Sequence, residues 1–300
     1  MTACSTPWPA AGGARPGDPV SAVLRPASEP DVAGMEAVFL ANEDEEHFPP
    51  GTVTRYLEHL VARGTVAVAE LDGRIVAFGA TVDTGRSIHL ADLFVLPAHQ
   101  GRGLGSRLLE VVFGGSRPRT TFASNDPRAL PLYVRAGMMP LWPNLYLGGD
   151  PRALPAPPGG YSVETIEISA MAEHERAWTG VDRGPDLVHW AGEAASRPFA
   201  VRSGREVVAV GLARLRLNRR GHWIDHAQVA PTADPQAALL AALRDGAGDV
   251  ELSGTCLGGP CPILPTLLEA GFRIVDRDIY LASDPTLVDP AREFLNTGIL

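Results

Sequence analysis

The chain has 300 residues, of which 45% are hydrophobic, and a formal net charge of −9. This length predicts about two domains, and this hydrophobic fraction is typical of globular proteins. The negative charge argues against a nucleic-acid partner. No hydrophobic run approaches the roughly 18 residues of a membrane span, and the N-terminus lacks the basic and apolar regions of a secretory signal. Three cysteines do not suggest a disulfide framework, so we expect a cytoplasmic protein.

Hydrophobic periodicity and turn residues predict alternating helices and strands in the first half of the chain. Asp72-Gly73, between two hydrophobic runs, predicts a β-hairpin. The strands before residue 97 then form an antiparallel meander, which is not how a dinucleotide-binding Rossmann unit begins. The expected elements, in chain order, are a flexible tail over residues 1–19, a strand over 20–25, a helix over 29–42, an acidic loop over 43–51, a helix over 52–63, strands over 65–69, 75–82 and 87–96, a helix over 104–113, a strand over 120–124, a helix over 127–136 and a strand over 139–147.

Residues 93–109 join a hydrophobic strand to an amphipathic helix through a loop with glycine at 101, 103 and 105. Such a loop gathers backbone amides at a helix N-terminus, where glycine lets a phosphate approach without a Cβ in the way. The sequence therefore predicts an anion site, with an ordinary glycine-rich turn as the alternative. The dinucleotide fingerprint needs glycine where Ser106 stands, and a Walker-type loop needs a lysine, which the chain does not contain.

The loop carries the pattern Gln/Arg-x-x-Gly-x-Gly, after a strand that ends at Pro97. This segment resembles the acyl-coenzyme A pyrophosphate loop of the GNAT superfamily of N-acetyltransferases. The resemblance implies that the loop amides hold the diphosphate of acetyl-CoA and that the pantetheine arm pairs with the preceding strand. It also implies that a backbone amide near Phe94 or Val95 polarises the thioester oxygen. The residues expected to bind acetyl-CoA are Leu93, Phe94, Val95, Gln100, Gly101, Arg102, Gly103, Leu104, Gly105, Ser106 and Asn125.

The segment Ala129–Gly137 resembles the family's Ala-x-x-Leu-Tyr-x-x-x-Gly motif. The resemblance implies that Tyr133 protonates the leaving thiolate. A phenol has a pKa of about 10 and keeps its proton at neutral pH. A tyrosine that only packs is the alternative. The family usually has asparagine seven residues before the tyrosine, but Asp126 stands there and Asn125 is its neighbour.

The chain also repeats itself at an offset of 134 residues. The recurring segments are Ala136-Gly137 as Ala270-Gly271, Leu145-Tyr146-Leu147 as Ile279-Tyr280-Leu281, and Val95-Leu96-Pro97 as Val229-Ala230-Pro231. At this offset the three loop glycines become Pro235, Ala237 and Leu239, so the second copy has lost the loop. We therefore predict an α/β (α+β) fold of two tandem GNAT-like domains, each a mixed, mostly antiparallel sheet flanked by helices. The predicted parts are a tail over 1–19, an acetyl-CoA-binding domain over 20–150, a linker over 151–160 and a degenerate domain over 161–300.

Acyl transfer to an amine needs a group that accepts the amine proton. Asp92 and His89 lie on the strand that leads to the loop, and Glu45, Glu46 and His47 lie in the acidic loop. The predicted catalytic residues are Tyr133, Asp92 and Glu46. The acidic loop as a whole would favour a cationic acceptor, although a solvated surface loop is the alternative.

The predicted function is transfer of an acetyl group from acetyl-CoA to a small-molecule primary amine by direct attack. A non-catalytic acyl-CoA sensor or a structural partner is the alternative. We expect no metal, because Cys256 and Cys261 have no second ligand pair at a suitable spacing. We also expect no nucleic-acid or membrane partner. The sequence leaves the acceptor and the oligomeric state open. Abundant Ala, Arg, Gly and Pro without lysine suggest a GC-rich bacterial genome.

Overall fold

The structure is a computed structural model that describes residues 22–43, 51–124, 126–157, 159–192, 195–216, 221–295 and 297. These residues form two compact units. The first unit takes in residues 22–43, 51–81 and 92–115, and the second takes in residues 82–91 and the described residues from 116 onward. The strand β4 (Ile88–Val95) begins in the second unit and ends in the first.

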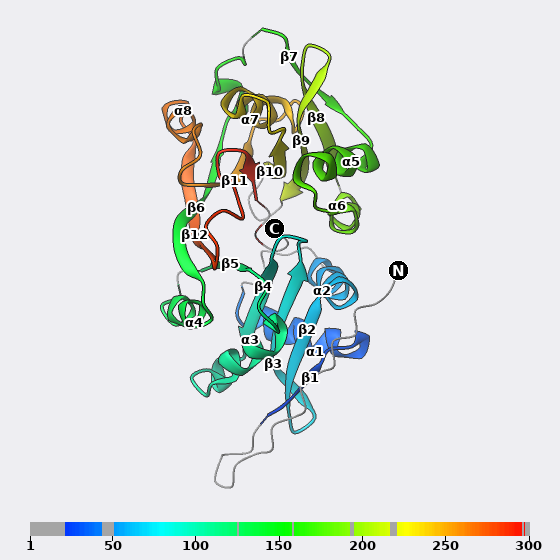
Figure 1. Ribbon diagram of the computed structural model, residues 1–300, viewed down its shortest axis with the longest axis vertical. Coiled ribbons are helices and arrows are strands. Elements are labelled where there is room, and N and C mark those ends of the chain that lie inside the picture. Colours follow the sequence, from blue (N-terminus) through cyan, green and yellow to red (C-terminus); the bar gives the residue numbers. More distant parts are fainter. Residues whose placement is uncertain are drawn as a thin grey trace. The chain divides into compact units, whose positions relative to one another are not determined.

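The first unit is built on antiparallel strands with helices packed against them (Figure 1). Its elements are β1 (Val23–Pro26), η1 (Glu29–Asp31), α1 (Val32–Leu40), α2 (Thr52–Arg63), β2 (Thr65–Leu71), β3 (Arg74–Asp83), η3 (Pro97–His99) and α3 (Leu104–Phe113). The predicted hairpin is confirmed, because β2 pairs with β3 around Asp72 and Gly73, which both have positive φ angles. Met35, Leu57, Phe78 and Leu108 are fully buried and form the core of this unit.

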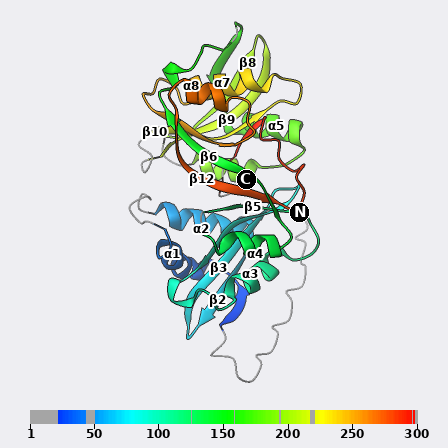
Figure 2. The same cartoon turned by 90° about the vertical axis from the view of Figure 1, so that its left-hand side faces the viewer.

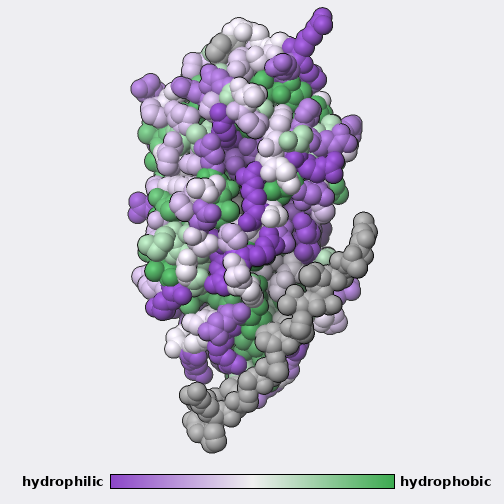
Figure 3. All heavy atoms as spheres, in the orientation of Figure 1, coloured by the Kyte–Doolittle hydropathy of each residue, from purple (hydrophilic) through white to green (hydrophobic). Residues whose placement is uncertain are grey.

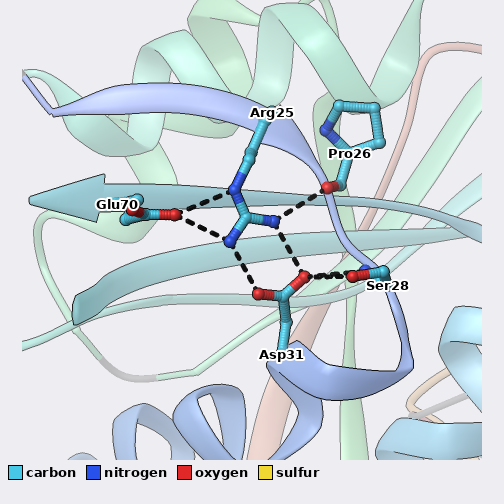
Figure 4. Close-up of polar contacts among 5 residues, drawn as sticks. All are labelled: Arg25, Pro26, Ser28, Asp31 and Glu70. Carbon is cyan, nitrogen blue, oxygen red and sulfur yellow. Dashed lines mark hydrogen bonds and ion pairs between the residues drawn. The ribbon is translucent and has the colours of Figure 1, made fainter. Parts of the chain in front are cut away.

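An ion-pair cluster ties the edge strand β1 to the rest of the first unit (Figure 4). The Arg25 guanidinium donates to Asp31 at 2.7 and 2.8 Å and to Glu70 at 2.7 and 2.9 Å. The amide and hydroxyl of Ser28 also donate to Asp31, at 2.8 and 2.7 Å. These bonds, the Arg25 bond first, hold the pKa of Asp31 well below its usual range. The cluster therefore fixes the start of α1 against β2.

The second unit is a longer mixed sheet with helices on both faces. Its strand order is β4-β5-β12-β6-β11-β13-β10-β9-β8-β7, and the β4–β5 and β10–β11 pairs are parallel. Helix α7 packs on one face and α5 and α6 pack on the other. The elements after β4 are β5 (Arg119–Ala123), α4 (Ala129–Arg135), β6 (Met139–Gly149), η4 (Pro151–Ala153), β7 (Tyr161–Thr165), α5 (Ile168–Thr179), α6 (Gly184–Ala191), β8 (Arg197–Ser203), β9 (Glu206–Arg216), β10 (Gly221–Val229), α7 (Pro235–Asp245), β11 (Ser253–Gly258), α8 (Leu264–Glu269), β12 (Arg273–Ala282) and β13 (Glu293–Phe294).

The predicted α/β fold with a mixed, mostly antiparallel sheet is confirmed, and the repeat recurs in its hydrogen bonds. The Thr121 hydroxyl donates 3.0 Å to the Leu90 carbonyl, and the Thr255 hydroxyl donates 3.0 Å to the Ile224 carbonyl. Gly137 and Gly271 both end a helix with a positive φ angle, of 89° and 87°. Both pairs of positions differ by the offset of 134 that the sequence predicted.

The last strands of the two repeats are exchanged. Figure 2 shows β6 and β12 side by side, and they pair antiparallel, with Trp142 opposite Tyr280. The strand β6, from the first repeat, also pairs with β11 of the second, with Tyr146 opposite Cys256. The strand β12, from the second repeat, pairs with β5 of the first. The predicted boundaries at 150 and 161 therefore follow the repeats and not the compact units, and the domain assignment stays a prediction.

No helix in the described part of the chain is long and apolar enough to cross a membrane. On the face drawn in Figure 3, hydrophilic residues separate small groups of hydrophobic ones.

Candidate active site

The glycine loop of the first unit presents backbone amides to solvent. Gly101 and Gly103 have φ angles of 75° and 77°, and a Cβ added to either would meet no atom within 4 Å. The amide of Arg107 donates to the Gly103 carbonyl, which starts the bonding of α3. Among the described residues, no amide from Gly101 to Ser106 donates to a carbonyl. The first turn of α3 and the loop before it thus have donors available for an anion, and the anion site itself stays a prediction.

The side chain of Gln100 fixes the start of this loop. Its Nε2 atom donates to the Val95 carbonyl at 3.0 Å and to Oδ1 of Asn42 at 3.2 Å. Asn42 in turn donates to the Val38 carbonyl in α1. Gln100 therefore links the loop to the end of β4 and to the end of α1, which is a positioning role for its side chain.

The end of β4 has two distinct faces, as strand alternation requires. Leu93 lies on the face that packs against α3. A Cβ atom on Gly79 would lie 3.3 Å from Cδ1 of Leu93 and 3.5 Å from Cβ of Leu108 in α3, so the two leucines share this face. Phe94 lies on the opposite face, where its ring centroid is 5.0 Å from that of Phe39 in α1. Asp92 shares the face of Phe94.

Asp92 is an acid of the first unit whose pKa is raised. Its Oδ2 atom is buried without a hydrogen-bond partner among the described residues, and the carboxylate is hydrogen-bonded to Tyr56 of α2. Burial raises the pKa of Asp92 to about 7, the Tyr56 bond opposes that rise, and the charge of Glu43 adds to it. A carboxyl group with this pKa can accept a proton near neutral pH.

The remaining predicted site residues are distributed as follows. Tyr133 lies on α4 in the second unit and is buried, with an exposed fraction of 7%. Asn125 and Glu46, and with them Glu45 and His47, lie outside the described residues.

His89 is fully buried in the second unit. Its Nδ1 atom is 3.1 Å from the Thr120 hydroxyl, and its Nε2 atom is 3.4 Å from the Thr297 carbonyl. Burial, first of all, lowers the pKa of His89 to about 4. We therefore assign His89 a role in the packing of the sheet. Among the described residues, Asp92 remains the candidate for the catalytic base.

Comparison with known families matches residues 62–137 to the acetyltransferase (GNAT) domain. This segment therefore resembles the GNAT acetyltransferase family. It holds the glycine loop, the end of β4 and the Tyr133 helix, so the sequence resemblance is confirmed. No curated protein sequence matches the chain.

Solved structures extend the similarity to both repeats. A candidate acetyltransferase from Pyrococcus horikoshii is 16% identical, with a TM-score of 0.66, over 93% of this chain and 94% of its own. A GCN5-related N-acetyltransferase from Sphaerobacter thermophilus is 14% identical, with a TM-score of 0.52, over 93% and 98%. A tandem GNAT protein from the clavulanic acid biosynthesis pathway is 16% identical, with a TM-score of 0.50, over 88% and 99%. At these identities the similarity shows the fold, which is the tandem GNAT fold.

Among the described residues of the second repeat, the segment equivalent to the GNAT loop differs from it. Helix α7 starts at Pro235, three residues before the position equivalent to the start of α3. The Asp234 side chain caps α7 by accepting from the Gln236 amide at 3.0 Å, and Leu239 is fully buried. A carboxylate and a core leucine therefore occupy the region where the first repeat exposes amides.

The strand edge that we expect the coenzyme arm to use is also occupied in the second repeat. Residues 227–229 are equivalent to Leu93–Val95. Ala227 and Gln228 pair with the chain's own β13, and the Val229 amide donates to the Arg292 carbonyl at 3.0 Å. In the second repeat, β13 therefore occupies the strand edge that we expect to bind pantetheine in the first repeat.

Sequence reasoning missed Tyr56 and β13. Tyr56 lies on an amphipathic helix among buried residues, so its periodicity indicates only packing. Its hydroxyl reaches Asp92 because α2 packs on the face of β4 that carries Asp92. The two residues of β13 are too few to give a periodic signal.

The described residues contain no group of three His, Cys, Asp or Glu side chains that could hold a metal ion. Cys256 and Cys261 are buried.

Proposed function

We propose that the chain is an N-acetyltransferase that moves an acetyl group from acetyl-CoA to a primary amine. Asp92 carries the proposal. Its Oδ2 atom is buried and its pKa is raised to about 7, and it lies on the strand that runs directly into the GNAT loop. A sensor that only held acyl-CoA would have no use for a proton acceptor beside its thioester.

The loop residues from Gln100 to Ser106 bind the diphosphate through their amides, and Leu93, Phe94 and Val95 bind the pantetheine arm. Asn125 is a further ligand of the coenzyme. The amide of Phe94 or Val95 donates to the thioester oxygen and stabilises the oxyanion that forms on attack. The fit rests on the open space at Gly101 and Gly103 and on their free amides.

The proposed chemistry forms one C–N bond and breaks one C–S bond. Asp92 accepts one proton from the ammonium group of the acceptor, and the neutral amine nitrogen then attacks the thioester carbonyl carbon. Collapse of the tetrahedral intermediate releases the thiolate, and Tyr133 donates its phenolic proton to the sulfur. The attacking nitrogen gives its second proton to the Tyr133 phenolate and Asp92 returns its proton to solvent, so the products are the acetamide and free coenzyme A. Glu46 is a second candidate for the base.

The acceptor is proposed to be a small cationic amine. Asp92 and Glu43 lie close enough for the charge of Glu43 to raise the pKa of Asp92. Two carboxylates at one site attract a protonated amine and can deprotonate it there.

The test is a transfer assay with the full-length chain, acetyl-CoA and a panel of primary amines. Thiol release is followed by absorbance and the acetamide by mass spectrometry. We expect one acetamide for each coenzyme A released with at least one amine of the panel. Asp92→Asn should abolish most of this turnover, whereas the matched variant Asp72→Asn, in the exposed hairpin turn, should not. Acetyl-CoA binding without acetylation of any amine would support the sensor instead.

A further inference from the structure

A second polar site lies within the second unit. A cavity of about 40 Å³ is walled by the turn before β4, the end of α5, the loop after α5, the strand β10 and the C-terminal segment that leads into β13. A single buried water needs roughly 10–15 Å³, so the cavity holds more than one water. Its charged lining consists of Arg86, Glu175, Arg183 and Glu293. We call it the Glu293 cavity.

The Glu293 cavity lies on the face of the second repeat that corresponds to the Asp92 face of the first. At the offset of 134, Asp92 corresponds to His226 and Phe94 to Gln228. Ala227 and Val229 pack toward α7, whereas His226 lies on the other face, 2.9 Å from Glu175 of α5. The second repeat thus has a polar cavity on a face where the first repeat has its candidate base.

In the Glu293 cavity, Glu293 is the carboxyl group that lacks a close ion pair. It has an exposed fraction of 9%, and in the described part of the chain no basic group lies within ion-pair distance of it. Burial raises the pKa of Glu293 to about 7, although the charges of Arg86 and Arg183 oppose the rise. Glu175 differs, because His226 at 2.9 Å and Arg183 at 3.7 Å lower its pKa despite its burial.

Arg86 supplies the opposite charge at the exposed side of the cavity. Its guanidinium donates to the Thr179 carbonyl at 2.9 Å and to the Leu287 carbonyl at 3.4 Å. Within the described residues, no carboxylate lies within ion-pair distance of it. One cavity therefore has a buried carboxyl group and an arginine, neither of which forms a close ion pair with a described residue, although the charge of Arg86 acts on Glu293.

We propose that the Glu293 cavity binds a small zwitterion, an amino acid whose ammonium group pairs with Glu293 and whose carboxylate pairs with Arg86. Both charges of such a ligand are matched. The coenzyme has no place in this site, because α7 and β13 have replaced the features that would bind it. The site is a binding site and not a catalytic one, and it does not depend on the acetyltransferase proposal.

The test is calorimetry on the full-length chain without acetyl-CoA, with L-alanine as the probe. Ethylamine and propionate are its matched analogues, since each keeps one of its two charged groups. We expect L-alanine to bind and both analogues to bind at least about 10-fold more weakly. Glu293→Gln and Arg86→Gln should each weaken L-alanine binding by about 10-fold or more. The control Glu206→Gln, at an exposed acid of the same unit, should leave it unchanged.

Asp92→Asn should also leave L-alanine binding unchanged, which separates this site from the candidate active site. The proposal is overturned if L-alanine does not bind, or if either analogue binds as tightly as L-alanine. It is also overturned if binding survives both Glu293→Gln and Arg86→Gln. Arg86 is exposed, so its variant tests the site even where Glu293→Gln fails to fold.

Discussion

Removing the Tyr56 hydroxyl should raise the pKa of Asp92. Tyr56 is hydrogen-bonded to Asp92, and this bond opposes the effect of burial. A hydrogen bond to a charged group contributes about 1.5–3 kcal/mol, which corresponds to about 1–2 pKa units. In Tyr56→Phe we therefore expect the pKa of Asp92 to rise from about 7 by about 1–2 units.

The assay is the pH dependence of kcat/KM for acetyl transfer, compared between Tyr56→Phe and the unaltered chain. The titration of the amine is the same for both proteins, so the difference between the profiles reports the enzyme. The acid limb should move upward by about 1–2 units, with a loss of roughly 5–50-fold at pH 7 that is regained at high pH. The control Tyr161→Phe should leave the acid limb of the kcat/KM profile unchanged. Identical acid limbs, or a loss independent of pH, would refute the assignment of Asp92 as the base.

Three further variants test other parts of the account. Asp92→Asn should lower kcat by about 10²–10⁴-fold. The raised pKa of Asp92 makes the folded state lose stability as pH rises from about 4 to 7. Asp92→Asn should therefore also raise the unfolding free energy at pH 8 by up to about 4 kcal/mol, measured by urea unfolding. Tyr133→Phe should lower kcat by about 10²-fold without changing acetyl-CoA affinity, and a normal kcat would leave Tyr133 as a packing residue. Arg25→Ala should lower the unfolding free energy by about 1–2 kcal/mol at pH 7, since its guanidinium is a third exposed. The ion pair holds the pKa of Asp31 well below its value in the unfolded chain, so this loss should shrink as pH falls below about 4, where Asp31 of the unfolded chain is protonated first; an equal loss at pH 3 and pH 7 would contradict the ion-pair cluster.

Local features of the fold could be predicted from the sequence because each depends on neighbouring residues. The Asp72-Gly73 turn and the glycine that ends α4 need positive φ angles, and the sequence places glycine there. The loop at residues 101–105 has the same local cause. The repeat could also be recognised in the sequence, because structurally equivalent positions carry matching residues at an offset of 134.

The exchange of β6 and β12 could not be predicted, because both strands have the same pattern and either could pair with either sheet. Their pairing partners are set by packing between segments that are more than 100 residues apart. The same is true of Tyr56, whose hydroxyl acquires a role only when α2 meets β4. Asp92 could be named from its strand, but its pKa depends on burial that the sequence does not show.

Acetyl-CoA binding to the glycine loop is the central claim, and a matched pair of variants tests it most directly. Gly103 and Gly73 have nearly the same φ angles, 77° and 75°, and open space where a Cβ would lie. Replacement by aspartate therefore imposes a similar backbone cost at both positions, but only Gly103→Asp sets a carboxylate beside the loop amides. Calorimetry with acetyl-CoA should show that Gly103→Asp abolishes binding while Gly73→Asp retains the affinity of the unaltered chain. Unchanged affinity in a folded Gly103→Asp variant would contradict the account.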